Sequence, residues 1–304
     1  MNPRQSALVQ LHLAILIFGF TGILGRLISL DEGPLVWYRM MIASLSFLVI
    51  PRFWKTIKSV NRKNISAMMG TGALVAAHWI CFFGSIKYSN VSFALCMMAT
   101  ASLFTCILEP ILLKRPFSKR EFFLALLVIP GILYIFQFSA FYPVGMILGI
   151  GAAFLAAFFG TLNKLFVRHT PAIQVTFIEL LSGFLILSLF LPLYFKFKPT
   201  AVFGLPTLED GLWLLLLGTV CTTLAFLLSV NVLKQLSAFT TSLSINLEPI
   251  YGILLAAILF NEQDELGSNF YVGAILILGA VLLNGLTSSE GFKKRWTKFI
   301  TNPK

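Results

Sequence analysis

Long runs of apolar residues, each about as long as a bilayer-spanning helix, recur along the whole of this 304-residue chain. A helix that crosses the hydrocarbon core of a membrane needs about 20 predominantly apolar residues. The runs are too long and too uniformly apolar to be the alternating strands of a membrane barrel. The sequence therefore predicts an all-α integral membrane protein with ten transmembrane helices, over residues 8–28, 35–54, 65–86, 91–113, 122–138, 144–167, 173–195, 212–233, 238–260 and 270–286.

Composition supports a lipid environment. Hydrophobic residues make up 58% of the chain and charged residues only 12%, and the mean hydropathy is +0.88. A soluble protein carries about twice that share of charge. The net charge of +11 lies in short connections between the runs and forms no patch on a polar domain, so nucleic acid is not an expected partner. The four cysteines fall inside apolar runs without zinc-like spacing, so we expect no metal and no cofactor.

The distribution of cations predicts the orientation in the membrane. Of the 23 lysines and arginines, all fall in connections on one side except Arg26, Arg39, Lys87, Lys196 and Lys198. The positive-inside rule places the cation-rich side in the cytoplasm, and an even number of spans puts both termini there. The first apolar run has no cleavage site after it and is expected to be a retained helix. Short loops and the lack of an organelle signal favour a bacterial inner membrane.

The two halves of the chain resemble each other. Ile86-Lys87-Tyr88 is similar to Leu233-Lys234-Gln235, and in that register Ala101-Ser102 falls on Glu248-Pro249. Each half contains five predicted helices, and because five is odd the two halves must enter the membrane in opposite directions. Such inverted repeats are frequent in transporters, with the binding site near the midplane. The predicted division is a first repeat at 1–142, a second at 143–288 and a basic cytoplasmic tail at 289–304.

Four segments carry a family resemblance. They are IFGFTGILGRL, VWYRMMIAS, IKYSNVSFAL and VLKQLSAFTTSLSINLEPIYGILLAAILFNE. Together they resemble the drug/metabolite transporter superfamily, specifically its EamA-type ten-helix carriers. The resemblance implies export or exchange of amino acids, other metabolites or drugs. Ser102 stands where the family often has proline and Arg115 where it often has an acidic residue, which indicates that the first repeat has diverged.

Glu248 is the first candidate for the chemistry, because a carboxylate at membrane depth should face the bundle interior or a wet cavity. Pro249 has no N–H, so it frees the carbonyl of Ile245 and lets the helix bend. A bent helix with an acid beside it can bind a polar substrate and carry a coupling proton. The alternative is a protonated or hydrogen-bonded carboxyl that fixes the packing between repeats.

The other candidates are ionisable or small polar residues within apolar runs. His78, beside Trp79 and Phe82, either hydrogen-bonds substrate or is a neutral histidine satisfied by a neighbour. Glu179 can line an inner gate, and Arg39 can anchor to outer headgroups or attract an anionic substrate. Inversion places these two charges toward opposite faces, so no salt bridge is expected between them. Glu109 is expected to snorkel beside Lys114 and Arg115. Further candidates for the cavity lining are Asn246, Asn163, Thr100, Ser102 and Tyr251, the alternative for the small polar groups being interhelical hydrogen bonds.

These features favour a secondary transporter, an exporter or exchanger of small polar metabolites such as amino acids that works by alternating access. No Walker motif is present, so proton coupling or simple exchange is expected to drive it. The alternatives are a membrane-embedded enzyme and a channel or scaffold. No HExxH or GxSxG motif and no filter-like segment supports them, so we do not expect an enzyme. The expected partners are a small-molecule substrate and the lipid bilayer, with the chain a monomer or homodimer.

Overall fold

The computed structural model describes residues 2–58, 64–136, 142–199, 203–252 and 268–287, and within them the secondary structure is helical. The helices are α1 (Pro3–Leu27), α2 (Glu32–Ser46), η1 (Phe47–Val49), α3 (Pro51–Ile57), α4 (Ile65–Tyr88), α5 (Val91–Met98), α6 (Ala101–Leu113), α7 (Lys119–Phe136), α8 (Pro143–Phe166), α9 (Ala172–Phe197), α10 (Leu208–Gly218), the π-helical η3 (Thr219–Leu224), α11 (Ala225–Val232), α12 (Ala238–Ile245) and α14 (Ser268–Thr287).

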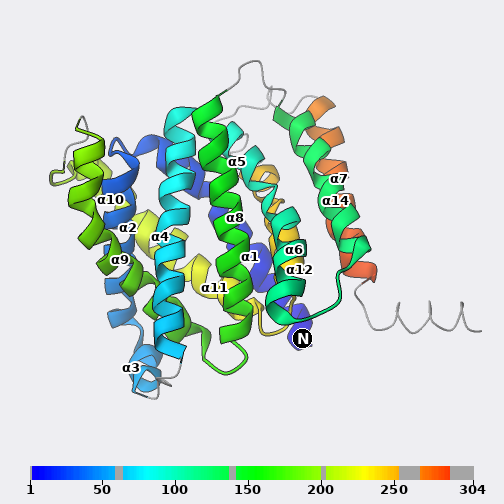
Figure 1. Ribbon diagram of the computed structural model, residues 1–304, viewed down its shortest axis with the longest axis horizontal. Helices are drawn as coiled ribbons and strands as arrows, with labels where there is room; N and C mark the ends of the chain where they lie inside the picture. The colour runs from blue at the N-terminus through cyan, green and yellow to red at the C-terminus, as the bar shows by residue number, and fades with distance from the viewer. Residues whose placement is uncertain (1, 59–63, 137–141, 200–202, 253–267, 288–304) are drawn as a thin grey trace, which may run out of the picture.

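The helices form a bundle in which most axes run from one end to the other (Figure 1). The start of α1 and the last turn of α14 lie toward the same end, at the bottom of Figure 1, and we call this end the N-terminal side. The opposite end is called the far side. α4 packs against α8 and α9, α7 pairs with α14, and α1 packs against α11. Segments from the two halves of the chain are therefore interleaved.

Six helical stretches of the described chain are long and apolar enough to cross a membrane. They are Pro3–Leu27, Ile65–Tyr88, Phe93–Leu113, Pro143–Phe166, Ala172–Phe197 and Leu208–Val232. A seventh is added if Glu32–Val49 and Pro51–Ile57, which meet at 90°, count as one span. The run predicted at 35–54 is thus bent rather than straight, because Pro51 begins a new helix. The run at 238–260 extends beyond the described residues, and the total of ten stays a prediction.

Two helical segments of the described chain are interrupted by residues outside the α-helix. Between α5 and α6, Ala99 and Thr100 leave the α-helix, and the Thr100 N–H donates to Met97 O instead of to the carbonyl four residues back. After α12, residues 246–247 also leave the α-helix, and the Asn246 N–H donates to Leu243 O. A helical segment resumes at 248–252. In the register of the predicted repeat, the two interruptions fall at equivalent positions.

Glycines allow two close crossings. A Cβ at Gly72 in α4 would overlap the backbone carbonyl of Glu179 in α9. A Cβ at Gly218 in α10 would lie 3.3 Å from the carbonyl oxygen of Arg39 in α2. Small residues let helix backbones approach in membranes, where packing rather than the hydrophobic effect holds helices together. The two crossings therefore fix how α4 and α9, and α10 and α2, lie against each other.

Candidate functional site

Two adjoining cavities lie among the helices. The first, which we call the central cavity, has a volume of about 130 Å³, and the second, the lower cavity, of about 90 Å³. They are contiguous because they share lining residues from α5, α8, α11 and α12, namely Met98, Ala156, Phe159, Phe226, Ser229 and Ile245. The lower cavity is also lined by Leu233 and Ala238, which lie toward the N-terminal side.

Arg39 of α2 lines the central cavity, and its side chain is only 2% exposed. Its Nε donates to the Thr222 hydroxyl at 2.6 Å, and the guanidinium carbon lies 3.9 Å from the centroid of the Trp79 ring. Its Nη1 has no hydrogen-bond partner. The alternative that Arg39 anchors to outer headgroups is therefore wrong, because the side chain is enclosed by α4 and η3. Its role in gating stays a prediction.

Glu248 lines the same cavity. It is half-buried and opens the helical segment that follows the interruption after α12. No hydrogen bond or ion pair joins its carboxylate to any described residue, and no ion pair joins it to Arg39 across the cavity. The central cavity is thus lined by two side chains of opposite charge. An unpaired carboxylate at membrane depth is available to a ligand or a proton.

His78, Trp79 and Phe82, three predicted binding residues of α4, also line the central cavity. The Nδ1 of His78 lies 2.8 Å from Ala152 O. Because a carbonyl oxygen only accepts, Nδ1 is the donor, and a neutral ring keeps Nε2 as an acceptor. The ring also packs edge-on against Phe159, with 5.3 Å between centroids. One ring nitrogen of His78 is thus hydrogen-bonded to a neighbouring helix, in agreement with the alternative interpretation of this residue. The side chain nevertheless lines the cavity.

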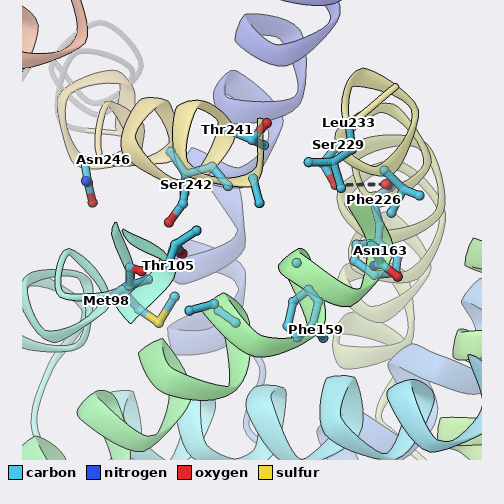
Figure 2. A pocket seen from close by; sticks show the side chains of 17 residues that line it. Met98, Thr105, Phe159, Asn163, Phe226, Ser229, Leu233, Thr241, Ser242 and Asn246 are labelled. Carbon is cyan, nitrogen blue, oxygen red and sulfur yellow. Dashed lines mark hydrogen bonds between the residues drawn. The ribbon is translucent and has the colours of Figure 1, made fainter. Parts of the chain in front are cut away.

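The lower cavity is lined by small polar side chains from facing helices, as Figure 2 shows. Asn163 comes from α8 and Thr105 from α6, while Thr241 and Ser242 lie on α12 and Asn246 immediately follows it. Asn163 Nδ2 donates to Glu179 Oε2 at 3.2 Å, and Asn246 Nδ2 donates to Ser102 Oγ at 3.3 Å. Asn163 and Asn246 therefore line a cavity, as predicted. They also make interhelical hydrogen bonds, which was the alternative role considered for the small polar residues.

The remaining predicted residues do not line either cavity. Thr100 and Ser102 donate to carbonyls of their own helical span, at 2.7 Å and 3.1 Å. Tyr251 Oη lies 2.8 Å from His12 Nδ1 of α1. Pro249, the residue that follows Glu248 in the sequence, is buried. Glu179 is fully buried beside Asn163, with Oε1 lacking a hydrogen-bond partner.

The prediction missed several lining residues. Two of them, Phe18 and Thr21, lie on α1, and others are the residues shared by both cavities and the lower-cavity residues Thr105, Thr241 and Ser242. Ser229 is a small polar residue within an apolar run, the same signal that identified Asn163. The aromatic residues carry no such signal, because the chain has 30 phenylalanines and most pack against lipid or core.

Glu109 is not a snorkelling side chain, and that prediction is wrong. It is 1% exposed, and its carboxylate accepts the backbone N–H groups of Ala238 and Phe239 at 3.2 and 2.8 Å, which caps the start of α12. Its predicted neighbour Arg115 does pair with it, at 3.0 Å, and also binds Glu121 at 2.6 Å. A carboxylate at a helix N-terminus is stabilising because the first N–H groups lack intrahelical partners.

A second charged cluster lies on the far side. Lys198, just after α9, donates to Asp31 at 2.9 Å and to Glu32 at 2.8 Å, and Tyr194 also donates to Glu32. Burial disfavours the charged form of Lys198, but its hydrogen bonds to Glu32 and Asp31 outweigh burial and raise the pKa of the ammonium group. Asp210 accepts from the Ser29 hydroxyl at 2.6 Å. These contacts join the α1–α2 connection to α9 and α10.

The apolar spans define a multi-pass helical membrane protein, and two sparsely charged cavities lie among its helices. Among the described residues no group of three His, Cys, Asp or Glu is placed to hold a metal ion. The chain belongs to the EamA-like transporter family, whose model matches it twice, at residues 5–137 and 143–286. The resemblance seen in the sequence is thereby confirmed.

Two of the relatives are named as uncharacterized transporters. The chain is 23% identical over 307 residues to the uncharacterized transporter YetK of Bacillus subtilis, covering 95% of this chain and 90% of that protein. It is 25% identical over 272 residues to an uncharacterized transporter of Haemophilus influenzae, covering 83% and 85%. A solved crystal structure superposes with a TM-score of 0.77 at 15% identity, over 93% of this chain and 98% of the other, which supports the fold alone.

Proposed function

We propose that this protein is a secondary transporter that exports or exchanges small polar metabolites, such as amino acids, across the cytoplasmic membrane. The observation that carries this proposal is the central cavity, which Arg39 and Glu248 both line without forming a salt bridge to each other. A site of this kind can bind a polar ligand deep in a bundle and needs no chemistry on it.

Alternating access by two inverted five-helix repeats fits this site. Support comes from the two matches to the family model and from the equivalent interruptions at Ala99–Thr100 and Asn246–Leu247. The charged clusters around Glu109 and Lys198 lie at opposite ends of the bundle and are suited to close one end at a time. In this proposal the chain has ten transmembrane helices, and both termini are cytoplasmic.

Glu248 is the proposed coupling residue. A carboxylate in an enclosed cavity can hold a proton in one conformation and release it in the other. A gradient of one pH unit stores about 1.4 kcal/mol per proton, so one-to-one coupling can drive accumulation by about tenfold. Glu179, fully buried beside Asn163, is the proposed inner-gate residue.

The test is transport in proteoliposomes, with purified protein and a labelled pool of amino acids and other metabolites, with and without a pH gradient. Wild type is compared with Glu248→Gln, which keeps the side-chain shape but cannot ionise. Glu209→Gln is the matched control, because Glu209 is an exposed carboxylate in the first turn of α10.

We expect wild type and Glu209→Gln to accumulate at least one compound about tenfold in response to a gradient of one pH unit. Glu248→Gln should move the same compound without responding to the gradient. A Glu248→Gln variant that still responds would exclude proton coupling at this residue. A folded wild-type protein that moves nothing from the pool would contradict the transporter function itself.

A further inference from the structure

The short helix α3 turns away from the helix before it. The stretch Glu32–Val49 and α3 (Pro51–Ile57) meet at 90°, and Figure 1 shows α2 running along the bundle with α3 at its lower end. Glu32 belongs to the charged cluster of the far side. The 18 residues of this stretch measure about 27 Å at 1.5 Å each, close to the thickness of the hydrocarbon core of a membrane. α3 therefore lies across the bundle axis, at the depth where the hydrocarbon ends and the lipid headgroups begin.

One side of α3 packs on the start of α9. Phe53 is 3% exposed, and its ring centroid lies 4.6 Å from that of Phe177. The side chain of Gln174 donates to the carbonyl oxygen of Thr56. α3 is therefore joined to the first turns of α9 by ring packing and by a hydrogen bond.

The other side of α3 carries cations. Arg52, Lys55 and the C-cap residue Lys58 are all exposed. Residues three apart on a helix are neighbours on its surface, so the three charges lie along one side. No ion pair joins them to an acidic side chain of the described chain, and the sequence has no acidic residue from 33 to 108. Within the described residues these like charges therefore have no counterion from the protein.

Exposed apolar side chains border the three cations. Leu48 and Val49, shortly before α3, are 45% and 81% exposed, and Trp54 on α3 is 52% exposed. Trp54 Nε1 donates to Leu48 O at 2.8 Å, which holds the ring beside the end of the preceding helical stretch. Tryptophan is enriched at the level of lipid headgroups, because its ring is amphipathic. The surface thus joins a lipid-facing apolar border to a row of cations.

From this arrangement we infer that α3 binds anionic phospholipid from the leaflet on the N-terminal side. The three cations pair with lipid phosphates, and the bordering apolar side chains contact the acyl chains. A soluble anion would gain only the charge contacts, which salt screens at an exposed surface. A phospholipid offers both an anionic group and an apolar chain, side by side, as this surface requires. The inference goes beyond the proposed transport function and does not depend on it.

A lipid held at α3 acts on α9 as well. Phe177, which packs on Phe53, lies two residues before Glu179, the proposed inner-gate residue. Lipid bound to α3 therefore holds the start of α9 against the rest of the bundle. For this reason we expect the lipid to stabilise the folded protein as a whole.

The test measures thermal stabilisation of the purified full-length protein in a neutral detergent, since a ligand that binds the folded state raises the melting temperature. The probes are phosphatidylglycerol, which is anionic, phosphatidylethanolamine, which has no net charge, and inorganic phosphate. The variant is the triple substitution Arg52→Gln, Lys55→Gln and Lys58→Gln. The control triple is Lys119→Gln, Arg168→Gln and Lys234→Gln, which removes three exposed cations from other connections on the cation-rich side.

We expect phosphatidylglycerol to stabilise wild type and the control triple at similar concentrations. The α3 triple should need at least tenfold more of this lipid, because each lysine or arginine near an anionic membrane surface contributes about fivefold to binding. Phosphatidylethanolamine and inorganic phosphate should have little effect on any of the proteins. Added salt should weaken the effect of phosphatidylglycerol on wild type, because the charges are exposed.

An α3 triple that responds as wild type does would overturn the inference. Equal losses in the two triples would show that the lipid is attracted to the basic side in general, and equal stabilisation by inorganic phosphate would show a site for a free anion. Either result also overturns it.

Trp54 fluorescence decides the question if the α3 triple does not fold. Phosphatidylglycerol with brominated acyl chains should quench a component of the emission that is missing in Trp54→Phe, and should quench it more than brominated phosphatidylethanolamine does. Equal quenching by the two lipids, or no quenching of this component, would contradict binding of anionic lipid at α3.

Discussion

Gly72 shows how a single residue sets the distance between two helices of this bundle. The backbone of α9 lies so close to it that a Cβ would overlap both the Glu179 carbonyl and the Ser182 side chain. Ser182 in turn donates to Glu179 O at 3.1 Å. Gly70, two residues earlier on the same helix, has open space where its Cβ would lie. Gly70 is therefore a matched control for substitutions at Gly72, because it lies on the same helix but has no close neighbour.

We predict that Gly72→Val lowers the free energy of unfolding by about 1–3 kcal/mol, the usual cost of overpacking a close contact. Gly70→Val should change it much less, because no neighbour has to move. Thermal denaturation of the purified variants in one detergent measures the difference. Equal melting temperatures for the two variants would show that α4 and α9 do not approach as described.

The candidate site could be predicted only where a residue type stands out from its run. Glu248, Arg39 and His78 did so, because an ionisable group within an apolar segment needs a reason to be there. Phe18, Phe159 and Phe226 did not, since the sequence does not mark which face of a uniformly apolar helix turns inward. Ser102 was assigned to the cavity for its polarity, but its hydroxyl is used to join the two interrupted spans.

At the scale of elements, the connection between α11 and α12 is held from two sides by opposite charges. The ammonium group of Lys164, on α8, donates to the carbonyl oxygens of Leu233 and Leu236. Glu109, on α6, accepts from the first N–H groups of α12. The cation thus binds the carbonyl end of one helix and the anion the amide end of the next, as the helix dipoles favour.

We predict that Glu109→Gln destabilises the protein by about 1–3 kcal/mol, because charge-assisted bonds to the start of α12 and to Arg115 are lost in a buried site. Arg115→Gln should cost less, since the Arg115 side chain is 26% exposed and its loss leaves the cap of α12 in place. Denaturation of both variants measures the order. A larger effect for Arg115→Gln would mean that the ion pairs, rather than the cap, hold this connection.

The sequence predicted where helices run better than where they break. Within the described residues each apolar run contains helix, because length and hydropathy alone mark a membrane segment. Pro249 also marks the interruption after α12. Nothing equivalent marks the interruption at Ala99–Thr100, where the chain has Ser102 and no proline, nor the π-helical turn at Thr219–Leu224. Such breaks depend on bonds between helices, such as that from Asn246 to Ser102, and these exist only once the bundle has formed.

At the scale of the whole molecule, charge differs between the two ends of the bundle. The far side carries the acidic residues Asp31, Glu32, Glu209 and Asp210, whereas α3 on the N-terminal side carries Arg52 and Lys55. The positive-inside rule links this asymmetry to orientation in the membrane.

We predict that Glu209→Cys is labelled by a membrane-impermeant maleimide in intact cells, and that Lys55→Cys is labelled only after permeabilisation. Both positions are exposed, so each thiol would be accessible on its own side. Wild type is the control for the four native cysteines, of which Cys96, Cys106 and Cys221 are buried. The opposite labelling pattern would mean that the protein is inserted the other way round, and labelling of both in intact cells would exclude the odd number of spans predicted between Lys55 and Glu209.

The two interruptions, at Ala99–Thr100 and Asn246–Leu247, bear on where the bundle is able to bend. An uninterrupted helix tilts as one rigid body, so a displacement at one end of the cavity is accompanied by a displacement at the other end. A span interrupted by two residues outside the α-helix consists of two shorter helical segments, and the angle between these segments can change at the interruption. Asn246, at the second interruption, donates to Ser102, two residues after the first, so the two interruptions are bonded to each other beside the lower cavity, and we expect any bending of these spans to be centred on this contact.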